Sequence, residues 1–146
     1  MQVPHNSFVV VADGEKMLFF RNEGDAEFPN LTIEKKIVQE SPADREQKTD
    51  SAGASAGGPT PGRASFSEVD FHQLDEDRFA ADMAAQLRER ALRNDFDSLI
   101  VVAPARTLGE LRKHYHQEVE KRLTGEIAKD LTGHPVAEIE KIIAAQ

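Results

Sequence analysis

The chain of 146 residues contains no cysteine. This absence excludes disulfide bonds, thiolate catalysis and cysteine-ligated zinc or iron–sulfur centres. A cysteine-free chain suits a reducing compartment, and we therefore expect a cytoplasmic protein. No apolar run approaches the roughly 20 residues that cross a bilayer. The amino terminus has neither the basic nor the apolar region of a signal peptide, so we expect no membrane insertion and no export by that route.

Several catalytic motifs are also missing. No serine stands in a Gly-x-Ser-x-Gly context, and the glycines follow neither the Walker-type nor the dinucleotide-binding spacing. His114 and His116 are two residues apart, whereas two ligands on one helical face are three or four apart. The residue patterns therefore predict no catalytic residue, no metal site and no cofactor.

A metal-dependent nuclease stays open as one alternative. Two-metal chemistry needs a cluster of carboxylates, because each cation requires several anionic oxygens. The carboxylates available for such a cluster are Asp13, Asp70, Glu110 and Asp130. Asp13 directly precedes Gly14, however, and a turn at this position accounts for it without a metal.

Positive charge is scarce overall and concentrated in one stretch. The formal net charge is −8, which opposes non-specific attraction to nucleic acid. Residues 104–123 nevertheless carry more basic than acidic side chains. Arg106 follows a predicted central strand, where ligands often bind in α/β sheets, and guanidinium groups suit phosphate. Arg106, Arg112 and Lys113 are therefore our candidates for contacts to phosphate or RNA, and the alternative is a solvated helix face with internal ion pairs.

Three strand patterns occupy the beginning of the chain. Residues 7–12 form a short apolar run that ends at Asp13-Gly14, a hairpin-turn dipeptide. Residues 17–21 suit a second strand that pairs antiparallel with the first. Apolar residues alternate with polar ones over 31–37, which predicts a third strand with one solvent-facing side.

A polar segment rich in glycine and proline then covers residues 41–63. Its only apolar side chains are alanines, so it contributes nothing to a packed core. A structureless connection of this length inside a compact domain is uncommon and is typical of a functional loop or of disorder. We expect a flexible loop whose tip is Gly57-Gly58-Pro59.

The second half of the chain alternates helix and strand patterns. An apolar stripe that recurs every four residues predicts a helix over about 74–94, with acidic residues 75–77 in its first turn and Asn94 as its stop. Residues 99–103 are fully apolar, as expected of a strand covered on both faces. The remaining predicted elements are one helix or two short ones over 108–123, a strand over 126–131 whose composition also suits a helix, and a closing helix over 136–143.

The predicted order is βββ, loop, α, β, α, β, α. It points to a single α/β domain over residues 1–146, in which three antiparallel strands are extended by strands that follow crossover helices. A mixed five-stranded sheet of ribonuclease-H-like type satisfies this order.

Three segments together resemble the signatures of the bacterial host attachment protein family, whose name reads "protein required for attachment to host cells". They are residues 10–14 (Val-Val-Ala-Asp-Gly), 102–112 (with Leu-Gly-Glu-Leu-Arg) and 129–135 (with Lys-Asp-Leu-Thr). The resemblance covers essentially the whole chain. That family is similar in turn to the middle domain of archaeal and eukaryotic class-one peptide-chain release factors, which implies a ribonuclease-H-like fold.

The resemblance also implies a function. In those release factors a Gly-Gly-Gln tip, on a loop ahead of a long helix, enters the peptidyl transferase centre and helps water attack peptidyl-tRNA. The equivalent stretch here holds Gly57-Gly58-Pro59. Proline offers neither a side-chain amide nor a backbone N–H. We therefore expect a cytoplasmic domain that binds the ribosome or structured RNA without ester hydrolysis.

Two other functions stay open. The family name implies an interaction protein that affects attachment to host cells, acting through a protein partner. The release-factor resemblance and the carboxylates leave a peptidyl-tRNA esterase or a metal-dependent nuclease as enzymatic alternatives.

Overall fold

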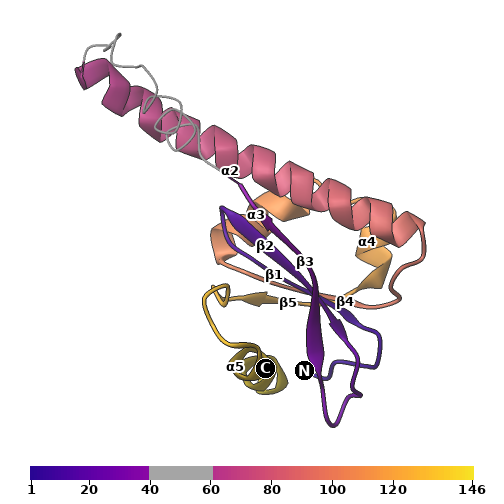
Figure 1. Ribbon diagram of the computed structural model, residues 1–146. Coiled ribbons are helices and arrows are strands. Elements are labelled where there is room, and N and C mark those ends of the chain that lie inside the picture. The colour runs from indigo at the N-terminus through magenta and orange to yellow at the C-terminus, as the bar shows by residue number, and fades with distance from the viewer. Residues whose placement is uncertain (40–60) are drawn as a thin grey trace.

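A computed structural model describes residues 1–39 and 61–146, with side chains described for residues 1–39 and 76–146 (Figure 1). The elements, in chain order, are β1 (Phe8–Ala12), β2 (Lys16–Asn22), β3 (Leu31–Val38), α2 (Pro61–Leu92), β4 (Leu99–Ala103), α3 (Ala105–Arg112), α4 (Gln117–Arg122), β5 (Leu123–Ala128) and α5 (Val136–Ala144). Among the described helices, none is both long enough and apolar enough to cross a membrane.

The strands form one mixed sheet in the order β3-β2-β1-β4-β5. Strand β1 pairs antiparallel with β2 and parallel with β4, and β4 pairs parallel with β5. Every residue of β1 and β4 is buried, because both strands are central and both faces of the sheet are covered. The predicted α/β domain with a mixed five-stranded sheet is confirmed.

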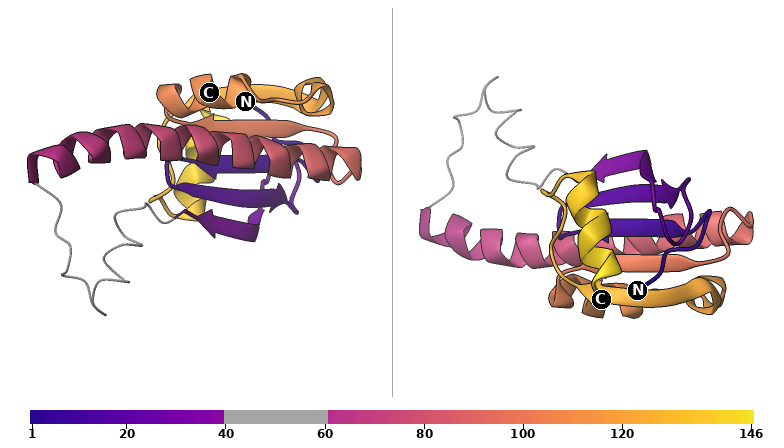
Figure 2. Two further views of the ribbon diagram at one scale, coloured as in Figure 1. Left: turned by 90° about the horizontal axis from the view of Figure 1, so that it is seen from above. Right: turned by 90° about the horizontal axis from the view of Figure 1, so that it is seen from below.

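Helices cover the sheet on both faces. Among the described helices, α2, α3 and α4 lie on one face and α5 lies on the other (Figure 2). Side chains alternate along β1, so Phe8 and Val10 join the core under α2, whereas Val9 and Val11 join the core under α5. The sheet is therefore the middle layer between two apolar cores.

The third strand differs from its prediction. Phe19 lies opposite Lys35 and Phe20 lies opposite Ile33, which leaves Glu34 as an extra residue in a β-bulge. One extra residue exchanges the two faces of a strand. Consequently Leu31 packs in the core under α5 while Ile37 packs against the core under α2, and Ile33 is exposed. The expectation of one solvent-facing side along the whole strand was wrong.

Helix α2 is longer than its prediction. It begins at Pro61 rather than near residue 74, so residues 61–63 belong to the helix and acidic residues 75–77 lie in its middle. Its start is rich in proline, glycine and serine, which favours a loop prediction, yet proline is well tolerated at the first helical position because its missing N–H has no partner there. The remaining predicted loop, including Gly57, Gly58 and Pro59, lies in the segment 40–60, outside the described residues.

The other boundaries follow the predictions with small shifts. Asn94 lies just beyond the end of α2 with a φ of 63°, the left-handed conformation expected of a helix stop. The segment 108–123 forms two short helices, α3 and α4, with the strand β5 beginning three residues earlier than predicted. Leu131 is not in the strand but packs in the core under α5. The closing helix is confirmed as α5, with Pro135 at its N-cap.

Candidate functional site

The three segments that carry the family resemblance, residues 10–14, 102–112 and 129–135, meet at one edge of the sheet. They follow β1, β4 and β5, which run parallel, so their carboxyl ends lie side by side. The Thr132 hydroxyl lies 2.9 Å from Asp13 Oδ2 and 2.9 Å from Asp130 Oδ1, within donating distance of both carboxylates. This contact joins the first segment to the third across 119 residues of sequence.

Asp13 is used fully as a turn residue. Its Oδ1 accepts hydrogen bonds from the backbone N–H groups of Glu15 and Lys16, each at 2.7 Å. Its Oδ2 accepts from Thr132. Oδ1 therefore holds the β1–β2 turn, as the sequence interpretation of Asp13-Gly14 expected, and Oδ2 ties this turn to the segment after β5.

Helix α2 crosses the same edge of the sheet at Glu76. A Cβ added to Gly14 would lie 3.2 Å from Glu76 Oε1, so the glycine permits this close approach. Glu76 Oε2 lies 3.4 Å from Nη2 of Arg106, the second residue of α3. We call Gly14, Glu76 and Arg106 the junction, because the first part of α2 projects beyond the sheet from this point (Figure 1).

Arg112 and Lys113 lie at the other end of α3. The guanidinium of Arg112 contacts Glu126 Oε1 through both Nε and Nη2 at 3.0 Å, and this hydrogen bond and charge raise the pKa of Arg112. Lys113 Nζ lies 3.1 Å from Glu110 Oε1. The side chains of Arg106, Arg112 and Lys113 are 65%, 56% and 67% exposed, so each is accessible although each has a carboxylate neighbour.

The next basic residues, Lys121 and Arg122, share one carboxylate. Glu118 Oε1 lies 3.1 Å from Lys121 Nζ and its Oε2 lies 2.8 Å from Arg122 Nη1. These hydrogen bonds, that from Arg122 above all, lower the pKa of Glu118. The basic stretch is therefore neutralised locally along its length, which is the ion-paired arrangement considered as the alternative above.

Tyr115, the only tyrosine of the chain, is partly buried and interacts with Glu126 and Arg112. Its hydroxyl donates to Glu126 Oε2 at 3.4 Å. Burial raises the pKa of Tyr115 strongly, and the negative charge of Glu126 raises it further. The phenol therefore stays protonated in the folded protein at a pH where a solvated tyrosine ionises.

This burial predicts a loss of stability at alkaline pH. The folded pKa of Tyr115 lies above the unfolded value of 10.0, so the stabilisation is complete below about pH 10 and declines as the pH rises further. We expect the absorbance of tyrosinate to appear only together with the loss of helical circular dichroism. Tyrosinate formation in a protein that keeps its native circular dichroism would contradict this assignment.

The carboxylates weighed for a nuclease do not assemble. Glu110 pairs with Lys113, while Asp13 and Asp130 share Thr132; the side chain of Asp70 lies outside the described ones. In the part of the chain whose side chains are described, no three His, Asp or Glu residues gather where they could hold a metal ion.

Sequence reasoning missed two residues of this edge. Thr132 was noted only as part of a resembling segment, and Glu76 only as one of three acidic residues at a supposed helix start. Thr132 contacts Asp13, 119 positions away, at 2.9 Å, and Glu76 contacts Arg106, 30 positions away, at 3.4 Å. No local pattern encodes such pairs.

The chain matches a family model of known proteins. The family model described as bacterial archaeo-eukaryotic release factor family 12 matches residues 6–143, a span that includes all three segments at the carboxyl edge. A search of curated proteins found no match. The release-factor resemblance is thus confirmed, while the relation to host attachment stays a prediction. The chain belongs to bacterial archaeo-eukaryotic release factor family 12.

Proposed function

We propose that this release-factor-like domain binds the ribosome or structured RNA without hydrolysing an ester. The observation that supports the proposal most is the projecting part of α2. The helix has 32 residues, a length of about 48 Å at 1.5 Å per residue, and its first turns extend beyond the sheet (Figure 1). In the sequence, one residue separates Gly57-Gly58-Pro59 from Pro61, where α2 begins. The tripeptide therefore comes, in the sequence, just before the first turn of α2, which is the end of this helix farthest from the sheet (Figure 1).

The basic residues of α3 support the same proposal. Arg106 lies at the junction, where the projecting part of α2 begins. It forms an ion pair with Glu76 at 3.4 Å, and both side chains of the pair are partly exposed. Ion pairs of this kind contribute little to stability, so the guanidinium can exchange the carboxylate for a phosphate at small cost. Arg112 and Lys113, at the other end of α3, are exposed cations that could add further phosphate contacts.

The topology and the tripeptide complete the proposal. We infer a ribonuclease-H-like sheet because β2 alone runs against the other strands in the order β3-β2-β1-β4-β5. Ester hydrolysis is not expected, because Pro59 replaces the residue that would present a side-chain amide.

Co-sedimentation with bacterial ribosomes and their separated subunits over a salt series tests the proposal. We expect binding at low salt that weakens as salt rises, because neutralised phosphates release counterions. The double variant Arg106→Ala/Arg112→Ala should bind more weakly and reduce the slope of log affinity against log salt by about two. Deletion of residues 52–60, which ends before α2, should weaken binding without unfolding the domain, since loop length affects stability little.

The matched control is Arg88→Ala/Arg93→Ala, which removes the same charge from the last turn of α2 and the residue just beyond it. This control should bind as the unchanged protein does. Equal weakening in both double variants would mean that only net charge matters, and absence of binding at low salt would refute the proposal. Circular dichroism of each variant verifies that the domain is folded.

A further inference from the structure

A groove of about 420 Å³ lies between α2 and the β2–β3 hairpin. Its floor is apolar and is formed by Met17, Ile37, Phe79 and Met83. Gln39 also lines the groove, and its backbone N–H donates to the carbonyl of Glu15, the residue after Gly14 of the junction, at 2.8 Å. A volume of this size is within the range of small-ligand sites.

Gln39, one of the residues that line the groove, has a side-chain acceptor without a donor. The side-chain Oε1 of Gln39 is buried and makes no hydrogen bond, and it is the only buried side-chain nitrogen or oxygen in this condition among those the structure describes. A buried polar atom without a partner costs free energy, and native structures contain few of them. An N–H group of a bound molecule would satisfy this oxygen.

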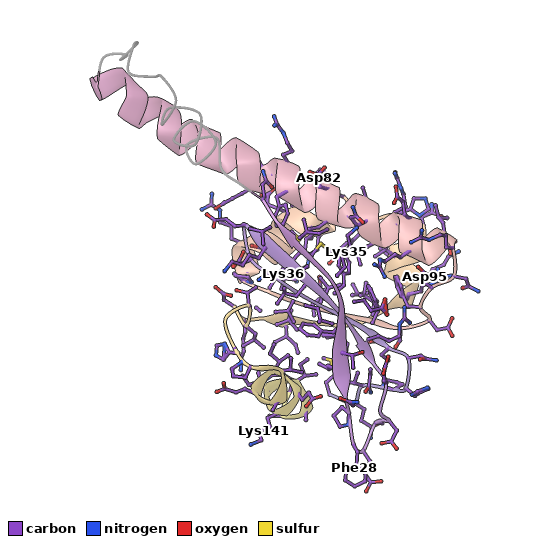
Figure 3. All side chains as sticks on the ribbon, in the orientation of Figure 1. Phe28, Lys35, Lys36, Asp82, Asp95 and Lys141 are labelled. Atoms are coloured by element: carbon purple, nitrogen blue, oxygen red, sulfur yellow. The ribbon has the colours of Figure 1, made fainter. Side chains whose placement is uncertain are left out.

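Cations stand at the rim of the same groove. Arg78 lies on α2, and Lys35 reaches across from β3 to donate to Gln86 Oε1 at 3.4 Å. Neither cation forms an ion pair with any side chain that the structure describes. Asp82 is the one carboxylate among the lining residues that the structure describes, and Figure 3 shows it on α2 with Lys35 on the neighbouring strand. The groove is therefore suited to a ligand that has an anionic group at the rim and an apolar part on the floor.

We propose that this groove binds an unpaired purine nucleotide of an RNA strand. The base would lie on the apolar floor, donate an N–H to Gln39 Oε1 and leave its phosphate between Arg78 and Lys35. Single-stranded RNA is commonly recognised in this way, by splayed bases on apolar or aromatic surfaces and hydrogen bonds to their edges. A purine fits better than a pyrimidine because its larger ring system covers more of the floor. The inference rests on the proposed RNA-binding function and names the ligand of a second site next to the junction.

Fluorescence anisotropy with labelled octamers of adenosine and uridine tests the groove. We expect the adenosine octamer to bind about tenfold more tightly, the effect of one favourable base contact. The variant Gln39→Met keeps the side-chain length but removes the amide acceptor, so it should bind the adenosine octamer more weakly. Its melting temperature should stay unchanged or rise, because the buried acceptor without a partner is gone. A merely structural role of Gln39 would instead lower the melting temperature.

Arg78→Ala and Arg88→Ala form a matched pair on the same helix, since only Arg78 lines the groove. We expect Arg78→Ala to weaken both octamers and Arg88→Ala to leave both unchanged. Equal effects of the two variants, or unchanged affinity of Gln39→Met for the adenosine octamer, would overturn the proposal. Adenosine monophosphate that binds while neither octamer does would also refute the RNA strand as occupant. If the protein co-sediments with ribosomes but neither octamer binds, the nucleotide site in the groove is refuted and the proposed function is not. If the octamers bind but the protein does not co-sediment, only ribosome binding is refuted.

Discussion

Replacement of Phe8 by alanine is expected to lower the free energy of unfolding by about 4 kcal/mol. The side chain is fully buried at the start of β1. Its ring stacks on Phe96 with a centroid distance of 5.2 Å and an interplanar angle of 6°, and the ring of Phe19 lies 5.4 Å away. Removal of this ring leaves a cavity that its aromatic neighbours can fill only in part.

The same ring also supports two guanidinium groups. Arg21 and Arg90 lie over Phe8 at 5.2 and 5.0 Å from its centroid, and both pair with Glu34 at the bulge of β3. Each contact of a cation with an aromatic face contributes about 0.5–1 kcal/mol at a partly exposed site. Loss of Phe8 therefore loosens the attachment of β3 to α2 as well as the core.

Urea denaturation followed by circular dichroism measures this effect. Phe8→Leu is the matched control, because leucine retains much of the volume and should cost only about 1.5 kcal/mol. A cost below 1 kcal/mol for Phe8→Ala would contradict the central position of this ring.

Replacement of Asn22 by alanine is expected to cost about 3 kcal/mol, because several buried polar groups lose their partners at once. Asn22 ends β2 and is fully buried. Its Oδ1 accepts from the backbone N–H groups of Gly24 and Asn30 at 2.9 and 2.8 Å. Its Nδ2 donates to the carbonyl of Val3 at 2.7 Å and lies within bonding distance of those of Pro4 and Asp25.

Hydrogen exchange makes this prediction specific. The amide protons of Gly24 and Asn30 should exchange much faster in Asn22→Ala, while those of β1 and β4 should lose only the protection that follows from lower global stability. Asn30→Ala is the control, since its side chain is exposed and should change stability by less than about 0.5 kcal/mol. Unchanged exchange at Gly24 in Asn22→Ala would show that Asn22 does not hold this loop.

The elements most readily predicted are those whose environment is uniform along the chain. β1 and β4 are central strands covered on both faces, so each is a continuous apolar run that indicates its own burial. The stripe of Phe79, Met83 and Leu87 likewise marks the part of α2 that packs on the sheet. The family could be inferred in the same way, because its three segments are local patterns, each at the end of a central or neighbouring strand.

Features that depend on a partner elsewhere in the chain were decided only by the tertiary structure. The bulge at Glu34 exists only relative to β2, and the start of α2 at Pro61 has a composition that locally favours a loop. Asn22 lies just beyond the second predicted strand, and no local pattern indicates that it bonds to Val3 and Asn30 in the folded chain. The hydrogen bonds that hold it join groups which only the complete fold brings together.

The candidate site divides along the same line. Arg106, Arg112 and Lys113 were chosen from local charge, but their carboxylate partners became visible only when α2 and β5 were placed beside α3. The junction and the groove at Gln39 need α2 to lie across strands that are distant in sequence. Sequence by itself determined the order of the elements and the family, because periodicity and motifs are local. The tertiary structure alone decided which charges are paired and where the groove lies, because both depend on distances between residues far apart in the chain.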